Sequence, residues 1–200
     1  MLLLDRADFD YVAYYCEENV WRLLARRELA GLPAWALVIS SPGRDFILRR
    51  QRAGRPVDGL VRWDYHVLAL VDDRTEGLAV LDLDTDLPFP CPAARYVAET
   101  FPAGPRQARS VPYIRMIPAE DYLASLVSDR SHMRRPDGSW IAPPPPWPWP
   151  GSSLRPRRPN VLEDWTDMGL REPGKVLEVA SLAELAARSE RAARRLKETR

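Results

Sequence analysis

Two apolar runs flank one short polar segment in the first half of the chain. The runs cover residues 61–71 and 78–84, and the polar segment between them extends from Asp72 to Gly77. Runs of this length around such a segment predict two strands that pair antiparallel. The fold must therefore contain a β-hairpin over these residues.

The register of this hairpin decides which polar side chains meet. If the turn covers residues 72–76, His66 faces Asp82, and if the turn lies one residue later, His66 faces Asp84. Because side chains alternate along a strand, both registers place the histidine and the two aspartates on one face of the sheet. The residues themselves leave both pairings open.

A helix is predicted to begin at or near Cys16. Apolar residues recur at helical spacing over residues 20–24, acids lie in the expected first turn, and Gly31 and Pro33 close the segment. The N-H groups and the dipole at a helix N-terminus lower the pKa of a thiol. The adjacent residues Glu17 and Glu18 oppose this effect, so a thiolate here needs a cationic partner.

The remaining pattern completes an α+β fold in a single catalytic domain over residues 1–200. The further elements we expect are strands at 35–40 and 46–50 joined as a hairpin, a strand at 111–117, helices at 96–101 and 119–127, and a C-terminal helix at about 181–200 with Ser181 and Glu184 as a capping box. The segment at about 136–159 is rich in proline and tryptophan, which favours polyproline geometry on the domain surface. A proline-rich recognition ligand is the alternative interpretation of this segment.

Composition excludes several classes of protein. The net charge of +1 gives no reason to expect a nucleic-acid or membrane partner. No run approaches the roughly 18 apolar residues of a membrane helix, and the first apolar run ends too early for a signal peptide. Two cysteines and two histidines without close spacing indicate neither a disulfide framework nor a zinc site. We therefore expect a cytoplasmic monomer.

Cys16, His66 and an aspartate together form the residue set of a cysteine hydrolase. A carboxylate beside an imidazole fixes its tautomer and stabilises the imidazolium that a cysteine nucleophile needs. The residue pattern also fits a buried apolar cysteine, a hydrogen-bonded histidine in a strand and turn-capping aspartates. The pattern leaves this structural interpretation open.

Several segments closely resemble successive motifs of the protein N-terminal glutamine amidohydrolase family. They follow the order of the family over roughly residues 14–150: 15–21 (YCEENVW), 63–67 (WDYHV), 82–91 (DLDTDLPFPC), 128–133 (SDRSHM), 138–140 (GSW) and 143–146 (PPPP). The resemblance implies a catalytic triad of Cys16, His66 and Asp82. It also implies a transglutaminase-like or papain-like α+β fold, in which the helix carrying the cysteine packs on a mainly antiparallel sheet carrying the histidine and the aspartate.

The same resemblance implies hydrolysis of the side-chain amide of an N-terminal glutamine in proteins or peptides, through a thioester and without a cofactor or metal. Recognition of the substrate α-ammonium requires a carboxylate or carbonyls. Glu18, Asp64 and Asp84 are the candidates, and we expect His132 to organise its loop or to form a pocket wall. Other transglutaminase-like hydrolases, such as an internal-glutamine deamidase or a peptidase, would use the same triad. A non-catalytic binding module is a further alternative.

Overall fold

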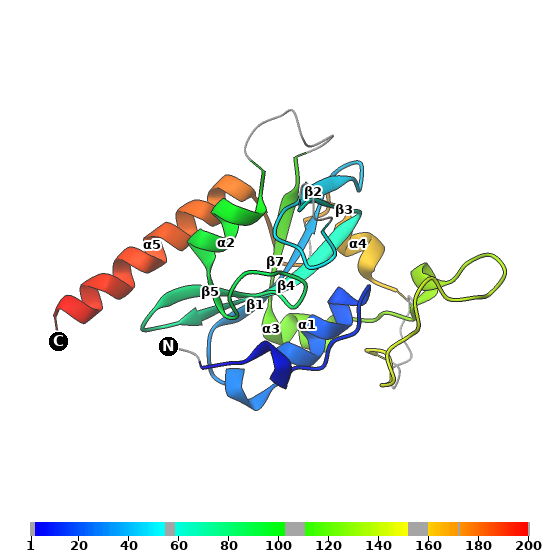
Figure 1. Ribbon diagram of the computed structural model, residues 1–200, viewed down its shortest axis with the longest axis horizontal. Helices are drawn as coiled ribbons and strands as arrows, with labels where there is room; N and C mark the ends of the chain where they lie inside the picture. Colours follow the sequence, from blue (N-terminus) through cyan, green and yellow to red (C-terminus); the bar gives the residue numbers. More distant parts are fainter. Residues whose placement is uncertain (1–2, 55–58, 103–110, 152–159, 172, 200) are drawn as a thin grey trace.

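A six-stranded antiparallel sheet forms the middle layer of the protein (Figure 1). The computed structural model describes residues 3–54, 59–102, 111–151, 160–171 and 173–199. In spatial order, the strands of the large sheet are β6 (Cys91–Pro92), β5 (Gly77–Leu81), β4 (Tyr65–Asp73), β1 (Ala34–Ser40), β7 (Tyr113–Pro118) and β8 (Lys175–Glu178). Two short strands, β2 (Phe46–Leu48) and β3 (Val61–Trp63), pair in a second sheet. The predicted α+β class is confirmed.

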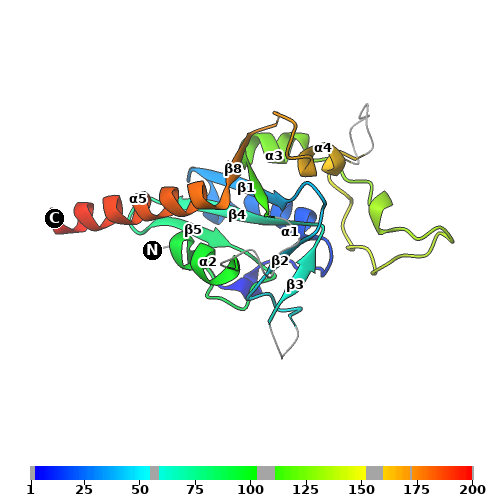
Figure 2. The same cartoon turned by 90° about the horizontal axis from the view of Figure 1, so that it is seen from above.

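Helices cover both faces of the large sheet (Figure 2). One face packs against α1 (Cys16–Leu24), α3 (Ala119–Ser125) and α4 (Leu162–Thr166). The other face packs against α2 (Ala93–Thr100) and α5 (Val179–Glu198), whose far end extends past the sheet. Short 3-10 helices are η1 (Arg6–Asp8), η2 (Arg27–Leu29) and η3 (Ser131–Met133). Among the described helices, none is both long and apolar enough to cross a membrane.

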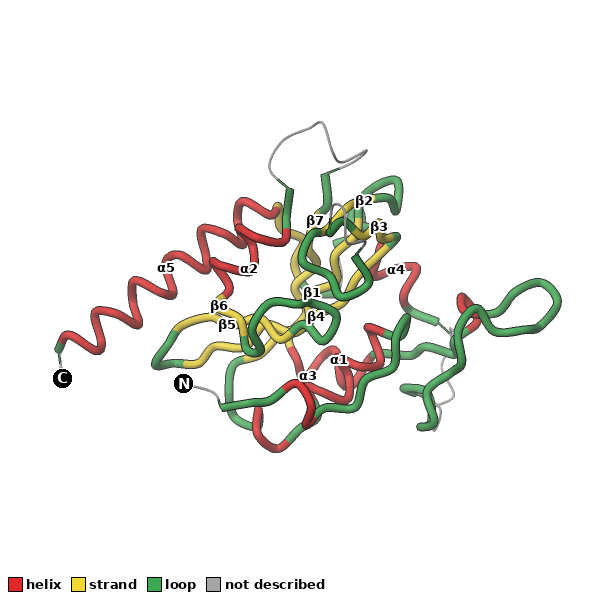
Figure 3. The backbone as a smooth tube through the Cα atoms, in the orientation of Figure 1, coloured by secondary structure: helices red, strands yellow, loops and turns green. Residues whose placement is uncertain are grey.

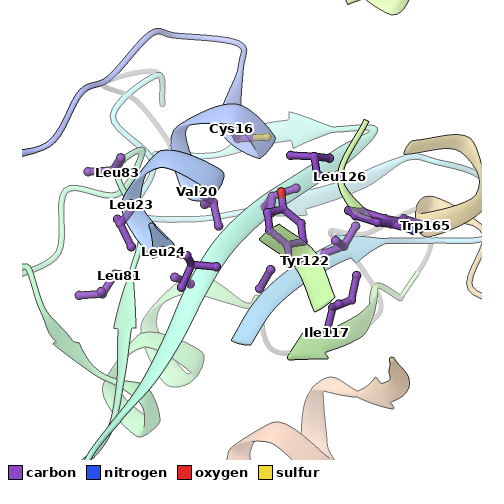
Figure 4. Packing of buried hydrophobic residues seen from close by; sticks show 14 of the residues in the cluster. Cys16, Val20, Leu23, Leu24, Leu81, Leu83, Ile117, Tyr122, Leu126 and Trp165 are labelled. Atoms are coloured by element: carbon purple, nitrogen blue, oxygen red, sulfur yellow. The ribbon is translucent and has the colours of Figure 1, made fainter. Parts of the chain in front are cut away.

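The apolar face of α1 fixes that helix on the sheet. Val20, Leu23 and Leu24 are buried and point toward the strands in Figure 4. Full burial of each such side chain contributes about 1.5–3 kcal/mol. Truncation of Leu23 to alanine would leave a cavity and cost about 2–5 kcal/mol. The position of Cys16 at the start of the helix is therefore held by packing along the rest of the helix.

The predicted hairpin over residues 35–40 and 46–50 is wrong. β1 pairs with β4 on one side and with β7 on the other, while β2 pairs with β3. β1 is buried on both faces over most of its length. A strand that is apolar on both faces belongs at the centre of a covered sheet, where both of its edges are occupied by other strands.

The antiparallel pairing of β4 with β5 is confirmed, but its register is the later of the two alternatives. The ladder runs from Asp73 opposite Gly77 to Ala69 opposite Leu81. β5 ends at Leu81, so neither aspartate is in the ladder. Asp82 lies in a turn closed by the N-H of Asp84, which donates to Oδ1 of Asp82 at 2.9 Å. This turn sets the positions of the two aspartates.

The predicted capping box of the C-terminal helix is wrong. α5 begins at Val179, and its N-cap residue is Glu178. Ser181 therefore lies inside the helix. The difference arises because Glu178 also ends β8, so the chain passes directly from the strand into the helix. Neither β8 nor α4 was predicted.

The described part of the proline- and tryptophan-rich segment contacts the domain through residues 142–147, whereas residues 134–139 are exposed. Figure 3 shows residues 134–150 as loop that extends from the helical layer. The Arg130 guanidinium donates to both carboxylate oxygens of Glu18 at 2.7 and 2.8 Å and to the carbonyl of Trp147 at 2.9 Å. Tyr15 Oη donates to the carbonyl of Ala142 at 3.1 Å. These contacts tie the segment to the start of α1; residues 152–159 of the prediction lie outside the described residues.

Candidate active site

His66 and Asp82 form a buried hydrogen-bonded pair at the adjacent ends of β4 and β5. Nε2 of His66 lies 3.1 Å from Oδ1 of Asp82, and both side chains are fully buried. The hydroxyl of Tyr96 donates to Oδ2 of Asp82 at 2.7 Å, and Nε2 of Gln51 donates to the same oxygen at 3.3 Å. With the N-H of Asp84 on Oδ1, both carboxylate oxygens are saturated with donors.

The electrostatics of this pair favour the charged form of both groups. Burial alone would lower the pKa of His66, but the charge and hydrogen bond of Asp82 raise that pKa above its usual value. Burial would raise the pKa of Asp82, but His66 and the hydrogen bonds from Tyr96 and the Asp84 N-H keep that pKa below its usual value. The indole of Trp63 stacks on the imidazole with ring centroids 4.6 Å apart. The histidine is thus held in one orientation.

Cys16 is the first residue of α1 and contacts the start of β4. The turn before the helix is fixed by Asn19, which accepts a hydrogen bond from the N-H of Val12 at 3.0 Å and donates to its carbonyl at 2.8 Å. A hydrogen bond from the main chain of Val67 reaches the thiol. Val67 directly follows His66 in β4, so the two candidate reacting groups belong to the same end of that strand.

The opposition to a thiolate that the sequence indicates at Cys16 outweighs the helix N-terminus in the structure without substrate. Burial, followed by the charges of Glu17 and Asp84, raises the pKa of the thiol well above its usual value. Oε2 of Glu17 lies 3.8 Å from Sγ. Because desolvation and a neighbouring carboxylate both disfavour a thiolate, they outweigh the helix N-terminus and the Val67 hydrogen bond.

The second imidazole nitrogen of His66 is not engaged by any described residue. Nδ1 is buried and has no hydrogen-bond partner among the described residues. Alternation along β4 places Cys16 with Tyr65 and Val67 on one face, while His66 shares the opposite face with Leu68. The two groups approach one strand end from different faces, and no hydrogen bond joins them within the described part of the chain.

A cavity of about 1070 Å³ opens beside Cys16, and neither His66 nor Asp82 is among its lining residues. Its lining includes Cys16, Trp63, Asp64, Tyr65, His132 and Ile141. Apolar and aromatic walls with a few polar groups are typical of a site for a small organic group. The cavity extends well beyond Cys16, which leaves room for chain that follows a bound side chain.

Two of the four predicted substrate-binding residues line the cavity, and the other two are engaged by other side chains. Glu18 is fully buried, and its carboxylate is engaged by Arg130 and by Nε1 of Trp147 at 2.8 Å. Oδ1 of Asp84 accepts from the hydroxyl of Tyr11 at 2.6 Å. Asp64 and His132 do line the cavity, so the structure brings these two to Cys16.

His66, Asp82 and Asp84 are also residues of the types that bind metals, and one donor atom from each lies within 4.8 Å of the others. Nε2 of His66 is engaged by Asp82, and Asp84 is engaged by Tyr11. These contacts satisfy the donors as a hydrogen-bonded network. The arrangement therefore fits an oriented imidazole better than a metal centre.

Sequence reasoning missed four residues at this site. Tyr96 and Gln51 orient Asp82 from α2 and from the segment after β2, both distant from Asp82 in the sequence. The sequence indicated Glu17 only as an opponent of the thiolate, and Tyr65 only as part of the 63–67 motif. The tyrosine donates to Oε2 of Glu17 at 3.1 Å. Alternation places Tyr65 on the α1 face, the signal that could have linked it to Cys16.

Cys91 has none of these surroundings. It lies in β6 and is fully buried in the core cluster beneath α2. Burial raises the pKa of its thiol to about 11. These are the surroundings of a buried cysteine that packs as a small apolar side chain.

Comparisons with known proteins show the family of the chain. The family model described as N-terminal glutamine amidase matches residues 11–186, which include Cys16, His66 and Asp82. Relatives named protein N-terminal glutamine amidohydrolase come from Drosophila willistoni, 47% identical over 149 residues, and Drosophila pseudoobscura pseudoobscura, 47% identical over 148 residues. Each match covers 70% of this chain and 70% of the relative. The chain belongs to the N-terminal glutamine amidase family.

Proposed function

We propose that this protein hydrolyses the side-chain amide of an N-terminal glutamine in proteins or peptides, giving N-terminal glutamate and ammonia, with Cys16 as nucleophile, His66 as acid and base, and Asp82 as the residue that orients His66. The observation that carries the residue assignment is the state of the imidazole. Its Nε2 is held by Asp82, and its buried Nδ1 is without a partner among the described residues. An imidazole arranged in this way serves a nucleophile that comes to Nδ1.

The reaction proceeds through a thioester. In the neutral form of His66, whose Nε2–H donates to Asp82, Nδ1 takes the thiol proton, and the Cys16 thiolate attacks the side-chain amide carbon of the glutamine. N-H groups at the start of α1 stabilise the oxyanion. His66 then protonates the departing ammonia, leaving a γ-glutamyl thioester. The same histidine removes a proton from water, which attacks the thioester and releases glutamate and the thiol.

The finer assignment of the fold is transglutaminase-like or papain-like. Its support is the order of the parts: a helix that begins at the nucleophile packs on an antiparallel sheet, and neighbouring strand ends of that sheet carry the histidine and the aspartate. A thiol and a buried imidazole–carboxylate pair near one strand end are what such a fold assignment requires.

Substrate profiling tests this function. We expect ammonia release, with the gain of one negative charge, from peptides that begin with glutamine. Peptides with N-terminal asparagine should react far more slowly, because their amide is one methylene short of the sulfur and a misplacement of about 1 Å costs roughly 100-fold. Acetyl-glutamine peptides and peptides with internal glutamine should be inert.

The same assay separates the rival hydrolases. Equal rates on free and acetylated glutamine would contradict N-terminal specificity and favour an internal-glutamine deamidase. Peptide-bond cleavage without ammonia would favour a peptidase, and the absence of both products would favour a binding module.

A further inference from the structure

A second carboxylate lies directly beneath the cavity. Glu17 is fully buried, its Oε2 accepts from the Tyr65 hydroxyl at 3.1 Å, and its Oε1 lies 3.5 Å from Nε2 of His132. Oε1 has no hydrogen-bond partner among the described residues. Cys16, Tyr65 and His132, which surround this carboxylate, all line the cavity. One layer of side chains therefore separates Glu17 from the cavity, and one of its carboxylate oxygens accepts no hydrogen bond from the described residues.

The charge of Glu17 is not balanced from within the described chain. Burial lowers the pKa of His132, so this ring is neutral at pH 7. The nearby Arg130 guanidinium is bound to Glu18 instead. Burial raises the pKa of Glu17 to about 7. A buried carboxylate in this state is stabilised by any cation that enters the space above it.

An N-terminal glutamine carries such a cation close to its amide carbon. The Tyr65 hydroxyl lies 3.1 Å from Oε2 of Glu17 and 3.2 Å from Nε2 of His132. With its proton donated to Glu17, the hydroxyl oxygen can accept from His132 on one lone pair and from an ammonium group on the other. We propose that Glu17 is the specificity residue for the free α-amino group, holding the substrate α-ammonium through the Tyr65 hydroxyl and by direct charge attraction. This inference rests on the proposed function and names the basis of its N-terminal restriction.

Binding of the ammonium also acts on the nucleophile. The ionisable groups that face Glu17 are Cys16 and Glu18 from α1, Tyr65 from β4, Tyr122 from α3 and His132 from η3. None of them brings a fixed positive charge. An α-ammonium near Glu17 offsets the charge that raises the Cys16 pKa, so the correct substrate favours its own attack. An acetylated substrate leaves that charge in place.

Asp64 is the competing candidate. It lines the cavity, but its side chain is 62% exposed, its Oδ1 accepts from the N-H of Tyr65, and its Oδ2 lies 3.8 Å from Arg44. An exposed carboxylate discriminates weakly against loss of a charge, because water screens the interaction. Asp64 therefore serves as the matched control for Glu17.

The test measures binding in the Cys16→Ala protein, which cannot turn substrate over. The ligands are a peptide beginning with glutamine and the same peptide lacking the α-amino group, whose N-terminal residue is otherwise identical. Their dissociation constants are measured by calorimetry in Cys16→Ala alone and with Glu17→Gln, Tyr65→Phe or Asp64→Asn added. The ratio of the two constants isolates the α-amino group, since a general effect on the pocket alters both.

We expect Glu17→Gln to reduce the preference for the amino peptide about 10- to 100-fold, the range for a lost hydrogen bond to a charged group. Tyr65→Phe should reduce it less, and Asp64→Asn should leave it within about twofold. In Cys16→Ala itself, the preference should be larger at pH 8 than at pH 5, where Glu17 is protonated. This pH dependence tests the inference even if Glu17→Gln fails to fold.

A preference that survives Glu17→Gln unchanged, or that disappears in Asp64→Asn, overturns the inference. A preference independent of pH between 5 and 8 does the same. Failure of the proposed function has a different signature, because the wild-type protein would then release no ammonia from N-terminal glutamine peptides whatever these ratios are.

Discussion

The two halves of the candidate active site differ in how fully their polar groups are hydrogen-bonded and their charges compensated. In the half formed by His66 and Asp82, every carboxylate oxygen has donors, and the pKa shifts of both groups favour the ion pair. In the half formed by Cys16 and Glu17, burial raises both pKa values, the charge of Glu17 raises that of Cys16 further, and Oε1 of Glu17 has no hydrogen-bond partner among the described residues. The imidazole is oriented before substrate arrives, whereas the thiol is not yet activated.

The orientation of the histidine is therefore built into the fold, whereas the activation of the thiol depends on the substrate. A histidine must be held in one tautomer through both steps of the reaction, so its partners are built into the fold. A thiolate is needed only when the correct substrate is present. Because the positive charge beside Glu17 comes from the substrate, the sulfur stays protonated, and so unreactive, between turnovers.

The largest expected effect comes from removal of the sulfur. Cys16→Ala and Cys16→Ser should abolish ammonia release from N-terminal glutamine peptides while circular dichroism shows an unchanged fold, because no other group can form the thioester. Cys91→Ser is the matched control and should retain most of the activity. A folded but inactive Cys91→Ser protein beside an active Cys16→Ala protein would place the nucleophile in β6.

The next largest effect concerns the half formed by His66 and Asp82. Asp82→Asn should lower kcat about 10⁴-fold, because an amide no longer fixes the tautomer of His66. Asp84→Asn should lower kcat much less, since Asp84 contacts Tyr11 and contributes its N-H, rather than its side chain, to Asp82. Steady-state kinetics on one glutamine peptide provide both values. The reverse ranking would make Asp84 the orienting acid.

The half formed by Cys16 and Glu17 should affect how the free energy of unfolding depends on pH. The pKa of Glu17 is raised from 4.5 to about 7, so between these values the folded protein holds a proton that the unfolded chain has lost. Stability therefore falls as pH rises through this window, by ~3 kcal/mol in all. Glu17→Gln removes the titration and should be the more stable protein at pH 8 but not at pH 4.5.

Urea unfolding of both proteins at the two pH values measures this crossover. A wild-type protein that is at least as stable as Glu17→Gln at pH 8 would show that Glu17 is already compensated without substrate. That result would remove the contrast between the two halves.

The smallest expected effect is removal of one support of Asp82. Tyr96→Phe deletes the donor to Oδ2 of a buried carboxylate and should cost ~2 kcal/mol of stability at pH 7. Because the hydrogen bond lowers the Asp82 pKa, its contribution is present above the unfolded value of 3.8 and is lost as pH falls through the folded value. The difference between the two proteins should therefore shrink below pH 3.8, as thermal unfolding can establish.

Local pattern was sufficient for the elements that carry the chemistry. The spacing of apolar residues after Cys16 and the two runs around the polar turn predicted a helix that begins at the cysteine and an antiparallel pair of strands that brings His66 to the aspartates. Each of these features depends on interactions between residues near in sequence. Helix periodicity and strand alternation report such interactions directly.

Only the tertiary structure decided how β5 ends and what surrounds Cys16. The register favours Asp84 opposite His66, yet the chain leaves the strand at Leu81, and Gln51 and Tyr96 hold Asp82 at the imidazole from elsewhere in the fold. The thiol pKa likewise depends on burial against β4 and on the direction of the Glu17 carboxylate. The sequence by itself determined which groups are present and the helix and strand that carry them. Packing between distant segments set their solvation and partners, because desolvation and contact are properties of the assembled core.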